Sequence, residues 1–263
     1  MSRLDRVFDQ GRPARQGGLV AYVTAGDPDA ARSAAVLRGV ARGGADVIEV
    51  GVPFSDPVAD GPAIQRASER ALASGGGLSG ALELVRGLRA TADVPIVLFT
   101  YVNPVLRMGL DAFADAAAKA GADGVLLLDL PIEEAEPARV ALDRAGLDQI
   151  FLVSPTTSDA RLAEAARLGR GFLYAISRLG VTGARDAVAE SAAAVVRRIR
   201  AATPLPVALG FGISRPEHVR EVWQYADGAV VGSALVDVVA RAAADGRDPG
   251  EAAEQFVRWL KGG

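Results

Sequence analysis

Eight short apolar runs recur along the chain and alternate with longer amphipathic, alanine-rich stretches. Short continuous apolar runs are typical of strands that are buried on both faces of a parallel sheet. The runs cover residues 19–24, 47–50, 95–99, 124–128, 150–153, 172–175, 206–209 and 228–231. The helical stretches cover residues 29–43, 64–73, 78–90, 111–120, 133–145, 159–168, 190–201 and 216–225. Eight strand–helix repeats in a chain of 263 residues predict a (β/α)₈ TIM barrel.

No break in composition or linker divides the sequence, so we expect one domain over residues 1–263. Leu4, Val7 and Phe8 have helical spacing and predict a short N-terminal helix that covers one end of the barrel. Two later helix starts show capping chemistry, at Asp27-Pro28 and at Ser214-Arg215-Pro216-Glu217. An open doubly wound sheet is the alternative fold, but its first turn usually carries GxGxxG, which is missing here.

Composition excludes several classes of function. With no cysteine and a single histidine, the chain has no disulfide and no Cys/His zinc site. That histidine, His218, lies on an expected outer helix, which disfavours a Ser-His-Asp triad. A net charge of −3 gives no electrostatic footprint for nucleic acid or an anionic membrane. The sequence has no apolar run of membrane-spanning length and no signal-peptide core, and we expect a cytoplasmic protein. Its only lysines, Lys119 and Lys261, lie away from the expected strand ends, which disfavours a Schiff base.

Glu49 stands inside the second apolar run, where a carboxylate is out of place. Burying an unpaired ionised carboxylate is so costly that the group must be paired, neutralised or used in chemistry. A second carboxylate, Asp60, lies in the Pro- and Gly-rich loop that follows. An acid in a buried strand beside a loop carboxylate fits an acid/base pair, and a structural network fits about equally well.

The strand–helix units that follow the second and sixth runs are longer than the others. In this fold the loops after the strands build the active site, so extra length there indicates function. The sixth loop, residues 177–185, has the composition of a lid. Glycines follow the sixth, seventh and eighth runs, where barrels often bind phosphate, and Ser233 could cap a short helix there.

These motifs together resemble the tryptophan synthase alpha chain family. The most specific run is Ile48-Glu49-Val50-Gly51-Val52-Pro53-Phe54-Ser55-Asp56-Pro57-Val58-Ala59-Asp60-Gly61-Pro62. The similarity continues in order through nearly the whole chain, at residues 24–28, 101–104, 129–131, 154–157, 180–185, 210–213 and 232–234. The chain departs from the family where Tyr22 replaces a common Phe and where Leu179 precedes the Gly-Val-Thr-Gly turn.

The resemblance implies retro-aldol cleavage of indole-3-glycerol phosphate to indole and D-glyceraldehyde 3-phosphate, without a metal or cofactor in this chain. Glu49 would be the general acid/base, Asp60 would pair with the indole N–H, and Tyr174 would lie near Glu49. Other implied site residues bind the phosphate (Gly183, Gly210, Phe211, Gly212, Gly232, Ser233) or line the indole pocket (Tyr22, Ile64, Phe99, Leu126, Val230).

The resemblance also implies a partner, the tryptophan synthase beta chain, which carries pyridoxal phosphate, in an α₂β₂ tetramer. Thr182 and Asp56 would act in lid closure and coupling, with Thr182 meeting Asp60. The contact surface would include Pro53, Pro57, Asn103 and Pro104. Three other functions stay open from the residues: a stand-alone lyase that releases free indole, another phosphate-binding barrel such as an isomerase, and a non-catalytic activator of a beta chain.

Overall fold

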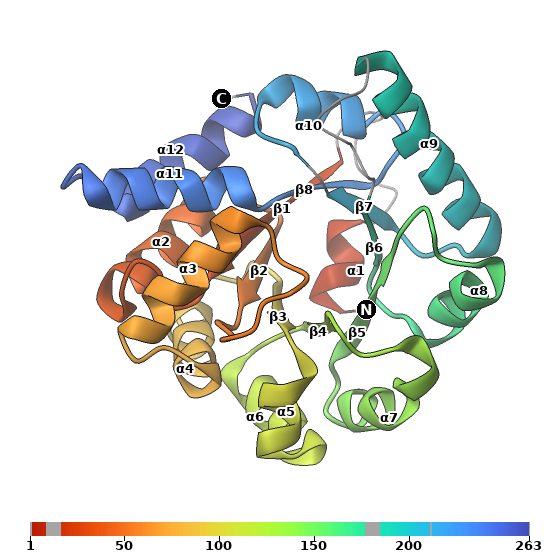
Figure 1. The fold of residues 1–263 in the computed structure, drawn as a ribbon, viewed down its shortest axis with the longest axis horizontal. Coiled ribbons are helices and arrows are strands. Elements are labelled where there is room, and N and C mark those ends of the chain that lie inside the picture. Colours follow the sequence, from red (N-terminus) through yellow and green to blue (C-terminus); the bar gives the residue numbers. More distant parts are fainter. Residues whose placement is uncertain (1, 9–16, 177–184, 211, 263) are drawn as a thin grey trace.

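The eight apolar runs form parallel strands that close into a single barrel in the computed structural model (Figure 1). The structure describes residues 2–8, 17–176, 185–210 and 212–262. Each strand pairs in parallel with the next, and β8 pairs with β1. The strands are β1 (Gly18–Thr24), β2 (Val47–Gly51), β3 (Ile96–Thr100), β4 (Gly124–Leu127), β5 (Asp148–Val153), β6 (Leu173–Ile176), β7 (Val207–Gly210) and β8 (Gly228–Val231). The predicted TIM barrel is confirmed.

Helices surround the barrel, and none of those described is long and apolar enough to cross a membrane. They are α1 (Arg3–Val7), α2 (Ala30–Arg42), α3 (Pro62–Ala73), α4 (Leu78–Arg89), α5 (Val102–Met108), α6 (Leu110–Ala120), η1 (Ile132–Glu134), α7 (Glu136–Arg144), α8 (Asp159–Leu168), α9 (Arg185–Ala202), α10 (Pro216–Val222), α11 (Ser233–Ala244) and α12 (Pro249–Leu260). The sequence patterns do not predict α5, which is short and contains Pro104, or α12, which lies beyond the last repeat.

Both capping predictions were wrong. The cap of α2 is Asp29, which accepts a hydrogen bond from the backbone N–H of Arg32, because Asp27 is used elsewhere. Asp27 is buried and binds the Arg70 guanidinium through two hydrogen bonds of 2.7 and 3.0 Å. The cap of α10 is Arg215 and has no side-chain hydrogen bond; the N–H of Ser214 donates to His218 Nδ1 instead.

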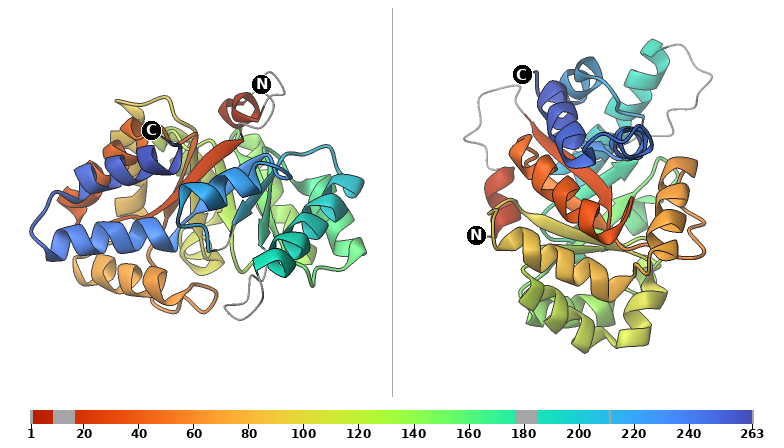
Figure 2. Two further views of the ribbon diagram at one scale, coloured as in Figure 1. Left: turned by 90° about the horizontal axis from the view of Figure 1, so that it is seen from above. Right: turned by 90° about the vertical axis from the view of Figure 1, so that its left-hand side faces the viewer.

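Helix α1 covers one end of the barrel, as predicted, and Figure 2 shows it at that end, apart from the ring of helices. Leu4 and Val7 are buried in the same cluster as the inward-facing side chains of the strands, such as Val20 and Ile150. The ring of Phe8 lies 5.4 Å from that of Phe172, next to β6. The other end of the barrel, where the strands terminate, is left for the functional loops.

An aspartate directly before a strand recurs at the end of the barrel covered by α1. Asp46, Asp123 and Asp227 each accept a hydrogen bond from a backbone N–H near the start of the preceding strand, at 2.8 Å in each case. Each also binds a cation, with Asp123 held by both Arg89 (2.7 Å) and Arg3 (3.0 Å). These acids, of which Asp123 is buried and the other two are partly buried, are therefore all paired, as burial of a charge requires.

Replacing Asp123 by Ala should lower the free energy of unfolding by about 3–5 kcal/mol, because Arg89, which is only 16% exposed, loses its closest carboxylate partner. Asp93→Ala is the matched control, since Asp93 also pairs with Arg3 but is 73% exposed. It should cost less than about 1 kcal/mol. Urea denaturation monitored by far-UV circular dichroism measures both variants. Equal losses would show that the burial of the Asp123–Arg89 pair adds nothing to its contribution.

Candidate active site

Glu49 projects into the barrel near the carboxyl end of β2. It pairs in register with Tyr22 on β1 and with Val97 on β3. The residue is 1% exposed, and neither carboxyl oxygen has a hydrogen-bond partner among the described residues. Loss of hydration raises the pKa of Glu49 from 4.5 to about 8. The side chain is therefore mainly protonated at neutral pH and available to exchange its proton.

Asp60 is held over the barrel by Tyr101, the residue that follows β3. The Tyr101 hydroxyl donates to Asp60 Oδ2 at 3.2 Å and accepts from the N–H of Ala59 at 3.1 Å. The Tyr101 ring stacks on Phe54, with ring centroids 4.9 Å apart. Partial burial raises the pKa of Asp60 to about 6, and the Tyr101 hydrogen bond opposes that rise. Sequence reasoning gives Tyr101 no role, although the residue stands in a motif that resembles the family.

The apolar residues predicted to surround a ring divide into a wall and a floor. Tyr22, Ile64 and Phe99 belong to one cluster, and the Tyr22 and Phe99 rings meet edge to face at 5.4 Å. Leu126 and Val230 are buried deeper, in the cluster that fills the barrel interior. The structure thus places four of the five predicted pocket residues on the strands of the barrel, and Ile64 packs against Tyr22 from helix α3.

Two tyrosines lie over glycines that end the neighbouring strands. A Cβ atom added to Gly51 would overlap the Tyr22 hydroxyl. A Cβ added to Gly210 would lie 2.5 Å from the Tyr174 hydroxyl. The pKa of Tyr174 is raised, first by burial and second by the negative charge of the nearby Glu49 carboxylate. Glycine at these strand ends gives each phenol room to lie beside the carboxylates.

The predicted phosphate-binding residues that the structure describes are Gly210, Gly212, Gly232 and Ser233. Gly212 has φ +67° and Gly232 caps α11, which begins at Ser233. Ser233 is therefore the first helical residue and not the cap that the sequence suggests. The N-terminus of α11 carries no side-chain cap. The N–H groups of Leu235 and Val236 donate to the Gly232 carbonyl, which leaves those of Ser233 and Ala234 as the ones for an anion. Gly183, Phe211 and Thr182 lie outside the described residues.

Gly232 lies both at the start of α11, where the phosphate is predicted to bind, and next to two residues of the predicted indole pocket. A Cβ placed on Gly232 would lie 3.7 Å from Tyr22 Cβ and 3.8 Å from Ile64 Cδ1. The loop after β2 reaches the same region, since a Cβ on Gly61 would lie 3.9 Å from Ser233 Oγ. The acids, the ring pocket and the start of α11 therefore form one continuous site.

The predicted partner contacts lie on the same end of the barrel. Asp56 and Asn103 are exposed, Pro57 and Pro104 are half-buried, and Pro53 is buried within this chain. Gln65 Nε2 donates to the carbonyl oxygens of Asp60 (3.0 Å) and Pro57 (3.4 Å), which fixes the loop after β2. Among the described residues, no group of three or more His, Asp or Glu side chains is placed to hold a metal ion.

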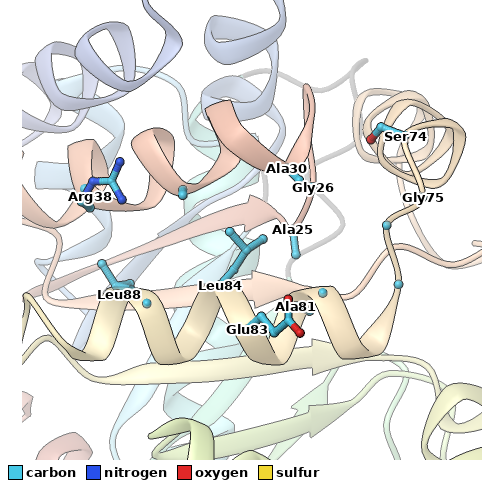
Figure 3. A pocket seen from close by; sticks show the side chains of 15 residues that line it. Ala25, Gly26, Ala30, Arg38, Ser74, Gly75, Ala81, Glu83, Leu84 and Leu88 are labelled. Carbon is cyan, nitrogen blue, oxygen red and sulfur yellow. The ribbon is translucent and has the colours of Figure 1, made fainter.

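A separate groove of about 390 Å³ lies between α2 and α4, outside the barrel (Figure 3). Small side chains leave this space open, and Gly80 and Gly87 would meet nothing within 4 Å if they carried a Cβ. Its polar side chains include Arg38, Ser74 and Glu83, and none of the three is buried. The lining of this groove therefore contains no buried ionisable side chain comparable to Glu49.

Known proteins match this chain over nearly its whole length. The family model for the tryptophan synthase alpha chain matches residues 8–262. The chain belongs to the tryptophan synthase alpha chain family. Alpha chains from Solibacter usitatus and Geobacter sp. M21 are 49% and 53% identical, covering 91% and 90% of this chain and 90% and 88% of theirs. The solved alpha subunit of Legionella pneumophila has a TM-score of 0.91 at 37% identity, covering 99% of this chain and 97% of that one.

A structure of Mycobacterium tuberculosis tryptophan synthase also matches, with a TM-score of 0.88 at 40% identity, covering 98% of this chain and 96% of that one. Membership of the family makes this chain a carbon–carbon lyase of tryptophan biosynthesis that acts on indole-3-glycerol phosphate. The alpha chain needs no cofactor, because the pyridoxal phosphate of tryptophan synthase resides in the beta chain.

Burial of Glu49 should make the stability of the fold depend on pH. Between its ordinary pKa of 4.5 and about 8, the folded state keeps the Glu49 proton that the unfolded chain releases. The free energy of unfolding therefore falls as pH rises, by up to about 1.4 kcal/mol per pH unit. Glu49→Gln has no proton to lose at this position, so its stability should fall less steeply.

Urea midpoints from pH 5.5 to 8.5 measure this difference. The gap between the Glu49→Gln variant and the wild type should widen from pH 5.5 to about 8 in favour of the variant and then level off. Glu83→Gln, which removes a carboxylate on α4 outside the barrel, should follow the wild-type curve. Parallel curves for Glu49→Gln and the wild type would refute the raised pKa.

Proposed function

We propose that Glu49 and Asp60 carry out the cleavage of indole-3-glycerol phosphate, with Glu49 as the general acid and base. The observation that carries the proposal is a fully buried carboxyl group with no hydrogen-bond partner among the described residues. Such a group destabilises the fold, and its burial adjusts its pKa to neutral pH, where general acids work best.

The reaction needs one proton delivered and one removed. Protonated Glu49 gives its proton to C3 of the indole, which places the positive charge on the ring nitrogen. The Glu49 carboxylate then takes the proton from the hydroxyl group next to the ring. The bond between C3 and the side chain breaks, its electron pair neutralises the ring to indole, and the hydroxyl carbon becomes the aldehyde. Glu49 ends protonated again, so the cycle needs no further acid.

Asp60 stabilises the charge that forms during this reaction. With a pKa of about 6 it is ionised at neutral pH, whereas Glu49, with a pKa of about 8, holds its proton. A carboxylate beside the ring N–H interacts more strongly with the protonated ring than with the substrate, and so it speeds the reaction. Tyr101 fixes the position of this carboxylate through its hydrogen bond to Asp60 Oδ2.

The remaining residues bind and enclose the substrate. The ring lies among Tyr22, Ile64 and Phe99, above Leu126 and Val230, and Tyr174 lies beside Glu49. The phosphate binds to backbone N–H groups at the start of α11, together with Gly210, Gly212, Gly232, Ser233, Gly183 and Phe211. Thr182 closes over Asp60 when the sixth loop folds down. Binding at both ends of the substrate holds its reacting carbon next to Glu49.

A tryptophan synthase beta chain is the proposed partner, in an α₂β₂ tetramer in the cytoplasm. The contact surface contains Asp56, Pro57, Asn103 and Pro104, with Pro53 supporting it from beneath. Two large exposed hydrophobic residues support this surface, because Val58 is 86% exposed beside Asp56 and Leu106 is 56% exposed on α5. Exposed apolar side chains beside half-buried prolines are typical of a surface that a partner covers.

Glu49→Gln and Asp60→Asn should each lower kcat by at least about 100-fold and change KM much less, because both groups act mainly in the transition state. Steady-state release of indole from indole-3-glycerol phosphate measures the effect. Asp111→Asn, an exposed carboxylate on α6, is the control and should keep full activity. Near-normal turnover by either site variant would show that its role is wrongly assigned.

Adding a beta chain should raise indole release by the purified chain strongly, because the proposed contact surface includes the loop after β2, which carries Asp60. The measurement is the rate of indole release with and without a beta chain. High activity that the beta chain leaves unchanged would instead indicate a stand-alone lyase. No activity in either case would favour an isomerase or a non-catalytic activator of the beta chain.

A further inference from the structure

The ring of Tyr22 spans the distance between the two ends of the proposed substrate site. At one end it meets Phe99 edge to face at 5.4 Å. At the other end it lies against Gly232, the cap of α11, where an added Cβ would be 3.9 Å from Tyr22 Cδ1. The part of the substrate between the ring and the phosphate is the three-carbon chain with its hydroxyl groups. Tyr22 is therefore alongside that chain.

The Tyr22 hydroxyl keeps a hydrogen-bond donor that the protein does not use. Thr24 Oγ1 donates to Tyr22 Oη at 3.4 Å, which leaves the proton of Tyr22 free to point elsewhere. Among the described residues no acceptor takes this proton. The Glu49 oxygens have no partner there, and the one side-chain hydrogen bond to Asp60 comes from Tyr101. A hydrogen-bond donor on a residue that is 5% exposed is expected to have an acceptor. We therefore expect a bound ligand to accept the proton of the Tyr22 hydroxyl.

The hydroxyl lies at the carboxyl end of β2, close to the reacting groups. It sits against Gly51, two residues after Glu49 on the same strand, and Tyr22 is itself the register partner of Glu49. A substrate hydroxyl that gives its proton to Glu49 must come close to that residue. The same oxygen, or the next one along the chain, is then near enough to accept from Tyr22.

We propose that the Tyr22 hydroxyl donates a hydrogen bond to a side-chain hydroxyl of bound indole-3-glycerol phosphate and so selects a hydroxylated chain over a deoxygenated one. The inference rests on the proposed site of Glu49 and Asp60. It assigns Tyr22 a role in specificity, in addition to the apolar wall that its ring provides. The alternative is that the hydroxyl only fills the space that Gly51 leaves open.

Binding of two ligands to two proteins separates these alternatives. The proteins are the Glu49→Gln variant, which turns over too slowly to consume the ligand, and the same variant with Tyr22→Phe. The ligands are indole-3-glycerol phosphate and indole-3-propanol phosphate, which lacks both side-chain hydroxyls. Isothermal titration calorimetry gives each Kd.

Tyr22→Phe should weaken binding of indole-3-glycerol phosphate by about fivefold to tenfold, the usual effect of one neutral hydrogen bond. It should change binding of indole-3-propanol phosphate less than about twofold, because that ligand has no hydroxyl to lose contact with. Equal changes for the two ligands, including no change for either, would overturn the proposal. Tyr225→Phe, a half-buried tyrosine near the start of β8, is the matched control and should leave both Kd values unchanged.

The same experiment distinguishes failure of this inference from failure of the proposed function. If Glu49→Gln still cleaves the substrate, the role of Glu49 fails, and the ligand comparison is made in Asp60→Asn instead. If Glu49→Gln is inactive but Tyr22→Phe affects both ligands equally, only the role of Tyr22 fails. Matching thermal midpoints for Glu49→Gln with and without Tyr22→Phe exclude loss of folding as the cause.

Discussion

Closure of eight parallel strands imposes one constraint on everything else in this molecule: all strands begin at one rim and end at the other. The two rims differ in how the carboxylates near them are paired. At the rim where the strands begin, Asp46, Asp123 and Asp227 are bound by cations and by backbone N–H groups. Near the other rim, Glu49 has no partner among the described residues. The acids that stabilise the barrel and the acid proposed for catalysis are thus placed toward opposite ends of the strands.

The unpaired state of Glu49 is tolerated because its surroundings are fixed. Its strand pairs on both sides within a closed barrel, which holds the backbone of Glu49 in place. The resulting rise in pKa weakens the fold progressively as pH rises from about 4.5 to about 8, and it also keeps the proton that the chemistry needs. Stability and reactivity are therefore opposed at this residue, as is common at active sites.

The sequence predicts the architecture well because the apolar runs and their spacing are local patterns. It also singles out Glu49, since a carboxylate in an apolar run is visible without any structure. It does not predict what Asp27 does, because the capping pattern at Asp27-Pro28 competes with a bidentate contact to Arg70, which is distant in sequence. The hydrogen bond from Tyr101 to Asp60 cannot be predicted for the same reason, because it forms between a loop and the end of another strand.

Glycines at the strand ends illustrate how the place of a residue can be predicted while part of its role is missed. The position of Gly210 after the seventh run predicts a part in a phosphate site. In the structure the first neighbour that a larger residue would meet there is the Tyr174 hydroxyl, and Gly51 stands in the same relation to Tyr22. In both pairs a tyrosine on one strand reaches to the end of the next strand and occupies the space of a missing side chain. A glycine in this position therefore shapes the barrel interior through its neighbour, whether or not its own backbone also approaches the phosphate.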